Sequence, residues 1–162
     1  MKKPRVSKRF DEDRFEIIKE ALPSVLEAIE DVAYEMDIPI EDWPVSISPM
    51  TTREIAQDKR VGGGHGVYLG DTQEVRLNAS MPTIGLHTNL IHEIWHHVDP
   101  EATEVFINSK IVPRIYEMAF GDELEESAWR MFRGHRGEDE ESEGDYQITD
   151  DEFEEERKHR DA

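Results

Sequence analysis

The chain contains one segment, residues 86–98, in which a helical apolar pattern overlaps the motif H-E-x-x-H. Apolar side chains recur there at every fourth position, which predicts one buried face of an α-helix. They are Leu86, Leu90, Ile94 and Val98. At about 100° per residue, His92, Glu93 and His96 group together on a different face. The segment therefore predicts a helix fixed in a core on one side and carrying a polar cluster on the other.

The two histidines of the motif have the spacing of a metal site. Residues four apart lie one above the other on a helix, so His92 and His96 can share a tetrahedral zinc ion. Glu93 between them can hold and deprotonate a water molecule. His97 lies about 100° further round the helix, so we leave it out of the ligand set. A fortuitous histidine pair on a polar helix face is the alternative interpretation, because the chain has seven histidines.

A catalytic zinc site needs a third protein ligand, and the chain has no cysteine to supply one. Residues 122–132 predict a helix in which Glu125 falls on the apolar face. Burial of an unpaired carboxylate is costly, so we predict Glu125 as the third ligand. The alternative is that Glu125 faces solvent as part of a helix capping box. Glu117 and His135 are the other candidate ligands.

Further polar residues could support such a site. Asp99 follows His96 by three residues, so we predict that it accepts a hydrogen bond from a ligand imidazole. It could equally mark the end of the helix before a proline. Three side chains could donate a hydrogen bond to an oxyanion, and the sequence does not select among them. They are His65, Tyr68 and Tyr116.

The remaining patterns predict both helices and strands, and hence an α+β fold. Residues 11–36 predict a helix that Pro23 kinks or divides. Residues 45–48 alternate as a short strand, and two further strands flank Asp71 as a hairpin. Residues 101–120 predict helical structure that is interrupted at Pro113.

The charge balance limits the classes of partner. The chain has 38 acidic and 19 basic residues, for a net charge of −19. A protein with this much negative charge repels the nucleic-acid backbone and anionic lipid. We therefore expect neither as a partner. An acidic, lysine-poor surface is typical of proteins that work in high salt, and acidic mesophilic proteins share it. With no apolar leader and no run of transmembrane length, the prediction is a soluble cytoplasmic protein.

Three regions differ in composition. Residues 1–10 form a basic N-terminal arm, and residues 11–132 carry the helical and strand patterns of a single domain. Residues 133–162 are acidic and contain few apolar side chains, which predicts a disordered tail.

The motif at His92, Glu93 and His96, with an E-x-x-A stretch starting at Glu125, resembles the gluzincin branch of zinc metallopeptidases over roughly residues 40–132. The chain is similar in size and element order to minimal single-domain members, such as ImmA/IrrE-like peptidases and the catalytic core of anthrax-lethal-factor-like enzymes. The resemblance implies a minimal zincin-like domain. Its small twisted sheet would pack on the N-terminal helix and the motif helix, with further helices following.

The resemblance also implies an activity, namely zinc-dependent hydrolysis of peptide bonds with Glu93 as the general base. A peptide or protein substrate would pair as an extra strand along the sheet edge, which the resemblance places at the strand containing Val75 and Asn78. The alternative function is a regulatory or non-catalytic zincin-fold protein that binds or cleaves a single partner. A broad protease is expected to digest unrelated unfolded proteins, whereas a regulatory protein of this kind would leave them intact.

Overall fold

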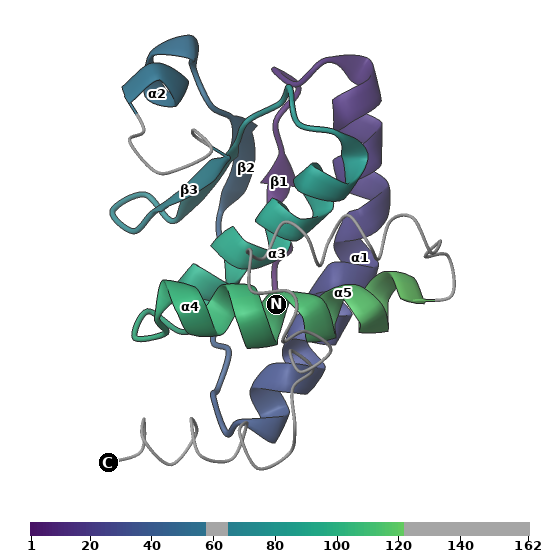
Figure 1. Ribbon diagram of the computed structural model, residues 1–162, viewed down its shortest axis with the longest axis vertical. Coiled ribbons are helices and arrows are strands. Elements are labelled where there is room, and N and C mark those ends of the chain that lie inside the picture. Colours follow the sequence, from purple (N-terminus) through teal and green to yellow (C-terminus); the bar gives the residue numbers. More distant parts are fainter. Residues whose placement is uncertain (58–64, 122–162) are drawn as a thin grey trace, which may run out of the picture.

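The computed structural model describes residues 1–57 and 65–121, which form one small sheet and several helices (Figure 1). The strands are β1 (Arg5–Val6), β2 (Ser46–Pro49), β3 (Gly66–Leu69) and β4 (Glu74–Leu77). The helices are α1 (Glu12–Glu35), α2 (Thr52–Gln57), α3 (Thr83–Val98), α4 (Glu104–Phe106) and α5 (Val112–Phe120), with a π-helical segment η1 (Ile107–Ile111) between the last two. The α+β class predicted from the sequence is confirmed.

Helix α1 runs unbroken through Pro23, so the predicted division into two helices was wrong. It begins where the side chain of Asp11 accepts a hydrogen bond from the backbone N–H of Arg14, at 2.9 Å. Pro23 lies on the exposed side of the helix, as does Lys19 one turn earlier. The carbonyl group that the proline leaves without a helical donor therefore faces water, and the helix continues.

The sheet has the strand order β1-β2-β4-β3, in which β4 is an internal strand. The predicted hairpin is confirmed, since β3 and β4 pair antiparallel with Tyr68 opposite Val75. On its other side β4 pairs in parallel with β2. The prediction that the strand containing Val75 and Asn78 forms the sheet edge was therefore wrong. In the described part of the chain, β3 takes that edge position.

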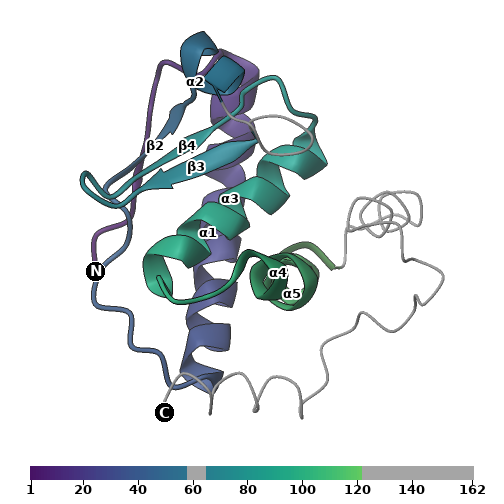
Figure 2. The same ribbon diagram turned by 60° about the vertical axis from the view of Figure 1, so that its left-hand side comes forward.

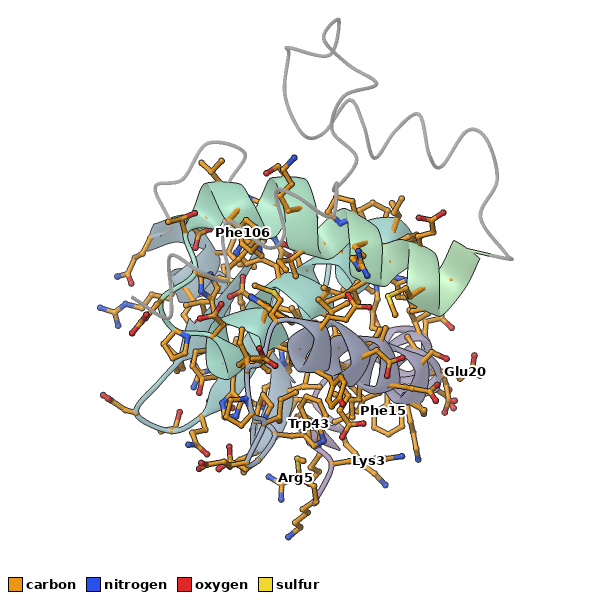
Figure 3. All side chains as sticks on the ribbon, turned by 90° about the horizontal axis from the view of Figure 1, so that it is seen from below. Lys3, Arg5, Phe15, Glu20, Trp43 and Phe106 are labelled. Atoms are coloured by element: carbon orange, nitrogen blue, oxygen red, sulfur yellow. The ribbon has the colours of Figure 1, made fainter. Side chains whose placement is uncertain are left out.

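The basic N-terminal segment is part of the fold rather than a separate arm. Strand β1 pairs in parallel with β2, with Val6 opposite Ile47. Phe10 is buried in the main hydrophobic core. The basic side chains of Lys3 and Arg5 lie at the outside of the molecule (Figure 3). Because the strand has only two residues, its alternation is too short to be recognised in the sequence.

Helix α3 lies at the centre of the fold. It packs on β3 and β4 on one side and on α1 and α5 on the other, as Figure 2 shows. The apolar stripe predicted for this helix is confirmed as buried. Its members are Leu86, Leu90, Ile94 and Val98. The polar face of α3 is thereby held next to the β3 edge of the sheet.

The helical region after α3 contains one π-helical turn. Thr103 caps α4, and its side chain accepts a hydrogen bond from the backbone N–H of Phe106 at 3.1 Å. The π turn of η1 follows, and α5 then begins with Pro113 in its first turn. A proline cannot donate a backbone hydrogen bond, so the predicted interruption takes the form of a change in helical pitch immediately before Pro113. π turns are rare and frequently occur at functional sites.

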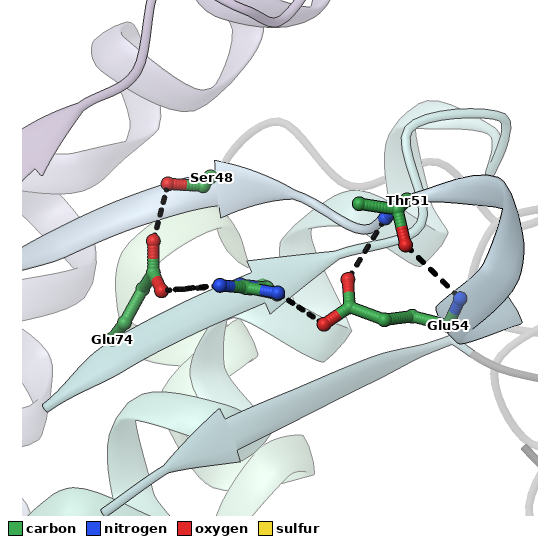
Figure 4. Close-up of polar contacts among 5 residues, drawn as sticks. Ser48, Thr51, Glu54 and Glu74 are labelled. Carbon is green, nitrogen blue, oxygen red and sulfur yellow. Dashed lines mark hydrogen bonds and ion pairs between the residues drawn. The ribbon is translucent and has the colours of Figure 1, made fainter. Parts of the chain in front are cut away.

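A polar network covers the outer face of the sheet (Figure 4). The guanidinium of Arg76 bonds both Glu74 and Glu54, and Ser48 donates to Glu74 at 2.8 Å. Thr51 and Glu54 cap one another at the start of α2, which has no buried residue. Arg76 therefore links α2 to the sheet through an ion pair.

Several predictions lie outside the described residues, namely the helix at residues 122–132 with Glu125, His135, and the disordered tail at residues 133–162. Within residues 1–57 and 65–121, no helix combines the length and the apolar character needed to cross a membrane.

Candidate metal centre

Three side chains on α3 and α4 bring potential metal ligands together. The Nε2 atoms of His92 and His96 lie 3.1 Å apart. The carboxylate of Glu104 spans them, with one oxygen 3.0 Å from Nε2 of His92 and the other 2.6 Å from Nε2 of His96. Among the described residues, this is the group of histidine and acidic side chains that could hold a metal ion.

The third member of this group, Glu104, was missed in the sequence. It is the first residue of α4, directly after the Thr103 cap and eight residues beyond His96. A helix cap followed by an acidic residue is a recognisable signal for a helix start, and it could have placed Glu104 at the end of a short connection from α3. The sequence could not show that this connection turns α4 back onto the histidines.

Asn108 fixes the orientation of the His92 ring. Its Oδ1 atom lies 2.8 Å from Nδ1 of His92. An amide oxygen accepts hydrogen bonds only, so Nδ1 donates and the lone pair of Nε2 faces His96 and Glu104. Burial lowers the pKa of His92, as does the neighbouring His96, while Glu104 acts in the opposite direction. The net effect favours the neutral imidazole that a metal requires.

Replacing Asn108 with alanine is expected to weaken zinc binding by about 10- to 100-fold, the usual cost of losing a partner of a ligand imidazole. The measurement is competition for zinc against a chelating dye. Ser109→Ala is the matched control, because Ser109 lies in the same π turn and bonds only a backbone carbonyl, that of Val105. Equal affinities for the two variants would contradict this role for Asn108.

Glu93 is the most deeply buried acidic residue of the site, with 2% of its surface exposed. It also lines the cleft described below. Strand β3 approaches it closely at Gly66, where an added Cβ atom would lie 3.2 Å from both Cγ and Oε2 of Glu93. The same Cβ atom would lie 3.1 Å from the carbonyl oxygen of Arg76. Glycine at this position therefore leaves room for the carboxylate against the sheet.

Gly66→Ala is expected to displace the Glu93 carboxylate. The peptide hydrolysis predicted from the sequence is then expected to fall by about 100-fold, a loss typical of misplacing a catalytic group by 1 Å. Zinc content is expected to remain unchanged, since the substitution does not touch the three ligands. Gly70→Ala serves for comparison, because a Cβ atom there has no neighbour closer than 4.0 Å. Turnover and zinc content should be measured together, and equal activity of the two variants would argue against the displacement.

The candidate metal centre opens into a cleft of about 690 Å³. Its walls come from α3, from the β3–β4 hairpin, from the segment that precedes β2, and from the segment after α3 together with α4. The lining residues are Glu41, Asp42, Val67, Tyr68, Gly70, Gln73, Glu93, His96, His97, Pro100 and Glu104. The volume is in the usual range for a ligand site. The cleft gives a ligand access to Glu93, His96 and Glu104 together.

No family model, curated protein or solved structure matches the chain. The function is therefore inferred from the geometry and chemistry of the site.

His97 and Tyr68 form a second polar arrangement in the same cleft. The Tyr68 hydroxyl lies 2.6 Å from Nδ1 of His97, and Nε2 of His97 lies 2.9 Å from Oδ1 of Asp42. The exclusion of His97 from the ligand set agrees with these contacts. Burial, and secondarily the charge of Asp42, raise the pKa of Tyr68, which keeps its hydroxyl protonated.

The other predicted site residues have different outcomes. Glu117 is exposed on α5 and is not a member of the ligand group. Asp99 is buried at the end of α3, where its backbone N–H donates to the carbonyl of Trp95 at 2.8 Å. The hydrogen-bond acceptor for His92 is Asn108, so a hydrogen bond from a ligand imidazole to Asp99 stays a prediction. Glu125 and His135, which lie outside the described residues, also stay predictions.

Proposed function

We propose that the chain is a zinc-dependent metallopeptidase in which His92, His96 and Glu104 hold the metal and Glu93 is the general base. The observation that supports the proposal most is the convergence of three ligand atoms beside a buried glutamate in an open cleft. The gluzincin resemblance of the motif agrees with a carboxylate as the third ligand. The geometry of the described residues favours Glu104 for this role.

The donor set fits zinc. Two imidazole nitrogens and one carboxylate are a usual protein ligand set for catalytic zinc, and they leave the fourth position open. Ligands at about 2.0–2.1 Å from a tetrahedral ion lie about 3.3 Å apart. The two Nε2 atoms are 3.1 Å apart, so small side-chain movements would accommodate the ion. A zinc ion bound here would receive the lone pairs of the two imidazoles and would offset the charge of the Glu104 carboxylate.

The proposed chemistry divides between the metal and Glu93. Zinc bound here would act as a Lewis acid that polarises the scissile carbonyl and acidifies the attacking water. Glu93 would accept the proton of that water and pass it to the departing amine. Its burial against Gly66 keeps the carboxylate in one place, so the proton acceptor is already positioned when substrate binds.

An extended substrate would bind along β3 as an additional strand. His65 accepts a backbone hydrogen bond from Asn78 at 2.9 Å. Since bonded and non-bonded positions alternate along an antiparallel pair, the backbone N–H and carbonyl of Tyr68 point away from β4. Tyr68 also lines the cleft. An added strand there would pass beside Glu93, with its alternate side chains directed into the cleft.

The test is hydrolysis of unfolded casein by the purified, zinc-loaded protein. Activity is expected to disappear with a chelator and to return when zinc is restored. Zinc binding without hydrolysis of casein or other unrelated proteins would instead favour the alternative, a regulatory protein that binds or cleaves one partner. Failure to bind zinc at all would contradict the peptidase proposal.

A further inference from the structure

Asp42, His97 and Tyr68 form a hydrogen-bond chain that the proposed hydrolysis does not use. The Nε2 atom of His97 lies 3.0 Å from the backbone carbonyl oxygen of Asp42 and 2.9 Å from its carboxylate. Both groups are acceptors, so Nε2 carries a proton, and in the neutral imidazole this is the single proton of the ring. The His97 side chain is only 6% exposed, which holds the ring in this orientation.

The protonated Nε2 determines the direction of the bond to Tyr68. In a neutral imidazole with its proton on Nε2, Nδ1 has a lone pair and accepts hydrogen bonds. The Tyr68 hydroxyl, 2.6 Å away, therefore donates its proton to Nδ1. A phenol has one proton, so the Tyr68 oxygen has only acceptor capacity left for other groups.

We infer that the Tyr68 hydroxyl binds an N–H donor of the substrate, an amide or a cationic side chain, and does not stabilise the oxyanion. The inference rests on the proposed peptidase function and specifies a substrate contact within it. Tyr68 would be a binding residue, and His97 a positioning residue that sets the polarity of the hydroxyl. This assignment distinguishes Tyr68 from the other tyrosine considered for the oxyanion, Tyr116, which is buried beside His87.

The other residues that line the cleft are suited to a ligand that carries hydrogen-bond donors. Glu41 and Asp42 line it together with Tyr68, and the described lining includes neither lysine nor arginine. An oxyanion donor would have to come from a group with a free proton, and Tyr68 has none to offer in this arrangement. A cationic or amide N–H would meet only acceptors on this wall.

The direction of the hydrogen bonds that join Tyr68, His97 and Asp42 can be measured without any enzymatic activity. Nitrogen-15 NMR of the His97 ring in the full chain at pH 8 is expected to show a proton on Nε2 and an accepting Nδ1. Tyr68→Phe is expected to shift the Nδ1 resonance, and Tyr34→Phe is the control because Tyr34 is 84% exposed. A proton on Nδ1 would overturn the inference even in an active peptidase. An accepting Nδ1 in a protein that hydrolyses nothing would contradict the peptidase proposal alone.

The N–H donor that Tyr68 binds is identified by measuring peptide binding to zinc-loaded Glu93→Gln protein, in which Tyr68 is either intact or changed to Phe. The probes are two fluorescent, end-blocked alanine peptides that carry either one central arginine or norleucine. We expect Tyr68→Phe to weaken binding of the arginine peptide by roughly tenfold, the loss of one charge-assisted hydrogen bond. An equal, smaller loss for both peptides would identify a backbone amide as the donor. Unchanged binding of both peptides would overturn the inference.

Discussion

Glu104→Ala is expected to abolish stoichiometric zinc binding by the purified protein. The variant removes one of the three candidate ligands and leaves only the two imidazoles on α3. Loss of a hydrogen-bond partner outside the ligand set already costs 10- to 100-fold in metal affinity, so the loss of a ligand is expected to exceed about 100-fold. Plasma mass spectrometry of the dialysed protein measures the zinc content per chain.

Two further variants make this result specific to Glu104. Glu117→Ala removes an exposed carboxylate from α5 and is expected to retain one zinc per chain. Glu125→Ala tests the ligand that the sequence pattern favoured. Zinc retained by Glu104→Ala but lost from Glu125→Ala would refute the centre described here and restore the prediction from sequence.

Glu93→Gln is expected to reduce peptide hydrolysis by about 10²- to 10⁴-fold, the usual contribution of a general base, and to leave zinc content unchanged. Glutamine has nearly the shape of glutamate, so it fits the narrow space beside Gly66 but cannot accept the proton of a water molecule. Turnover of a fluorogenic peptide and zinc content should be measured on the same preparations.

A matched substitution separates the effect of losing the general base from the effect of losing a negative charge in the cleft. Glu41→Gln changes another carboxylate that lines the cleft and is expected to change KM more than kcat. Loss of zinc from Glu93→Gln would show that Glu93 has a structural role. Turnover near that of the wild type would remove it from the proposed mechanism.

The motif helix could be predicted because its signals are local. The apolar residues at every fourth position and the spacing of His92 and His96 depend only on helix geometry. Glu93 and its neighbours therefore occupy the predicted face. The burial of Glu93 was not predictable, because it arises from the approach of Gly66 on a strand that lies far from it in the sequence.

The errors concern contacts between distant parts of the chain. The hairpin of β3 and β4 joins neighbouring segments and was predicted, whereas the parallel pairing of β4 with β2 was not. That pairing makes β4 internal and moves the edge to β3. Glu104 was missed as a candidate ligand for a related reason, since it reaches the histidines only because the chain turns back between α3 and α4. Glu125 lies outside the described residues, so its role as a ligand stays a prediction.

Because of the π turn in η1, the helical register that places Glu104 at the candidate metal centre differs from the register that buries the apolar face of α5. A π turn holds one residue more than the α-helical turn it replaces, so residues before it are rotated by about 100° relative to those after it. Glu104 precedes the turn, while the buried residues of α5 follow it, including Ile115. A chain shorter by one residue in η1 would keep α5 packed in the core and would turn Glu104 away from the histidines. The same architecture can thus exist with or without a third ligand, depending on a single inserted residue.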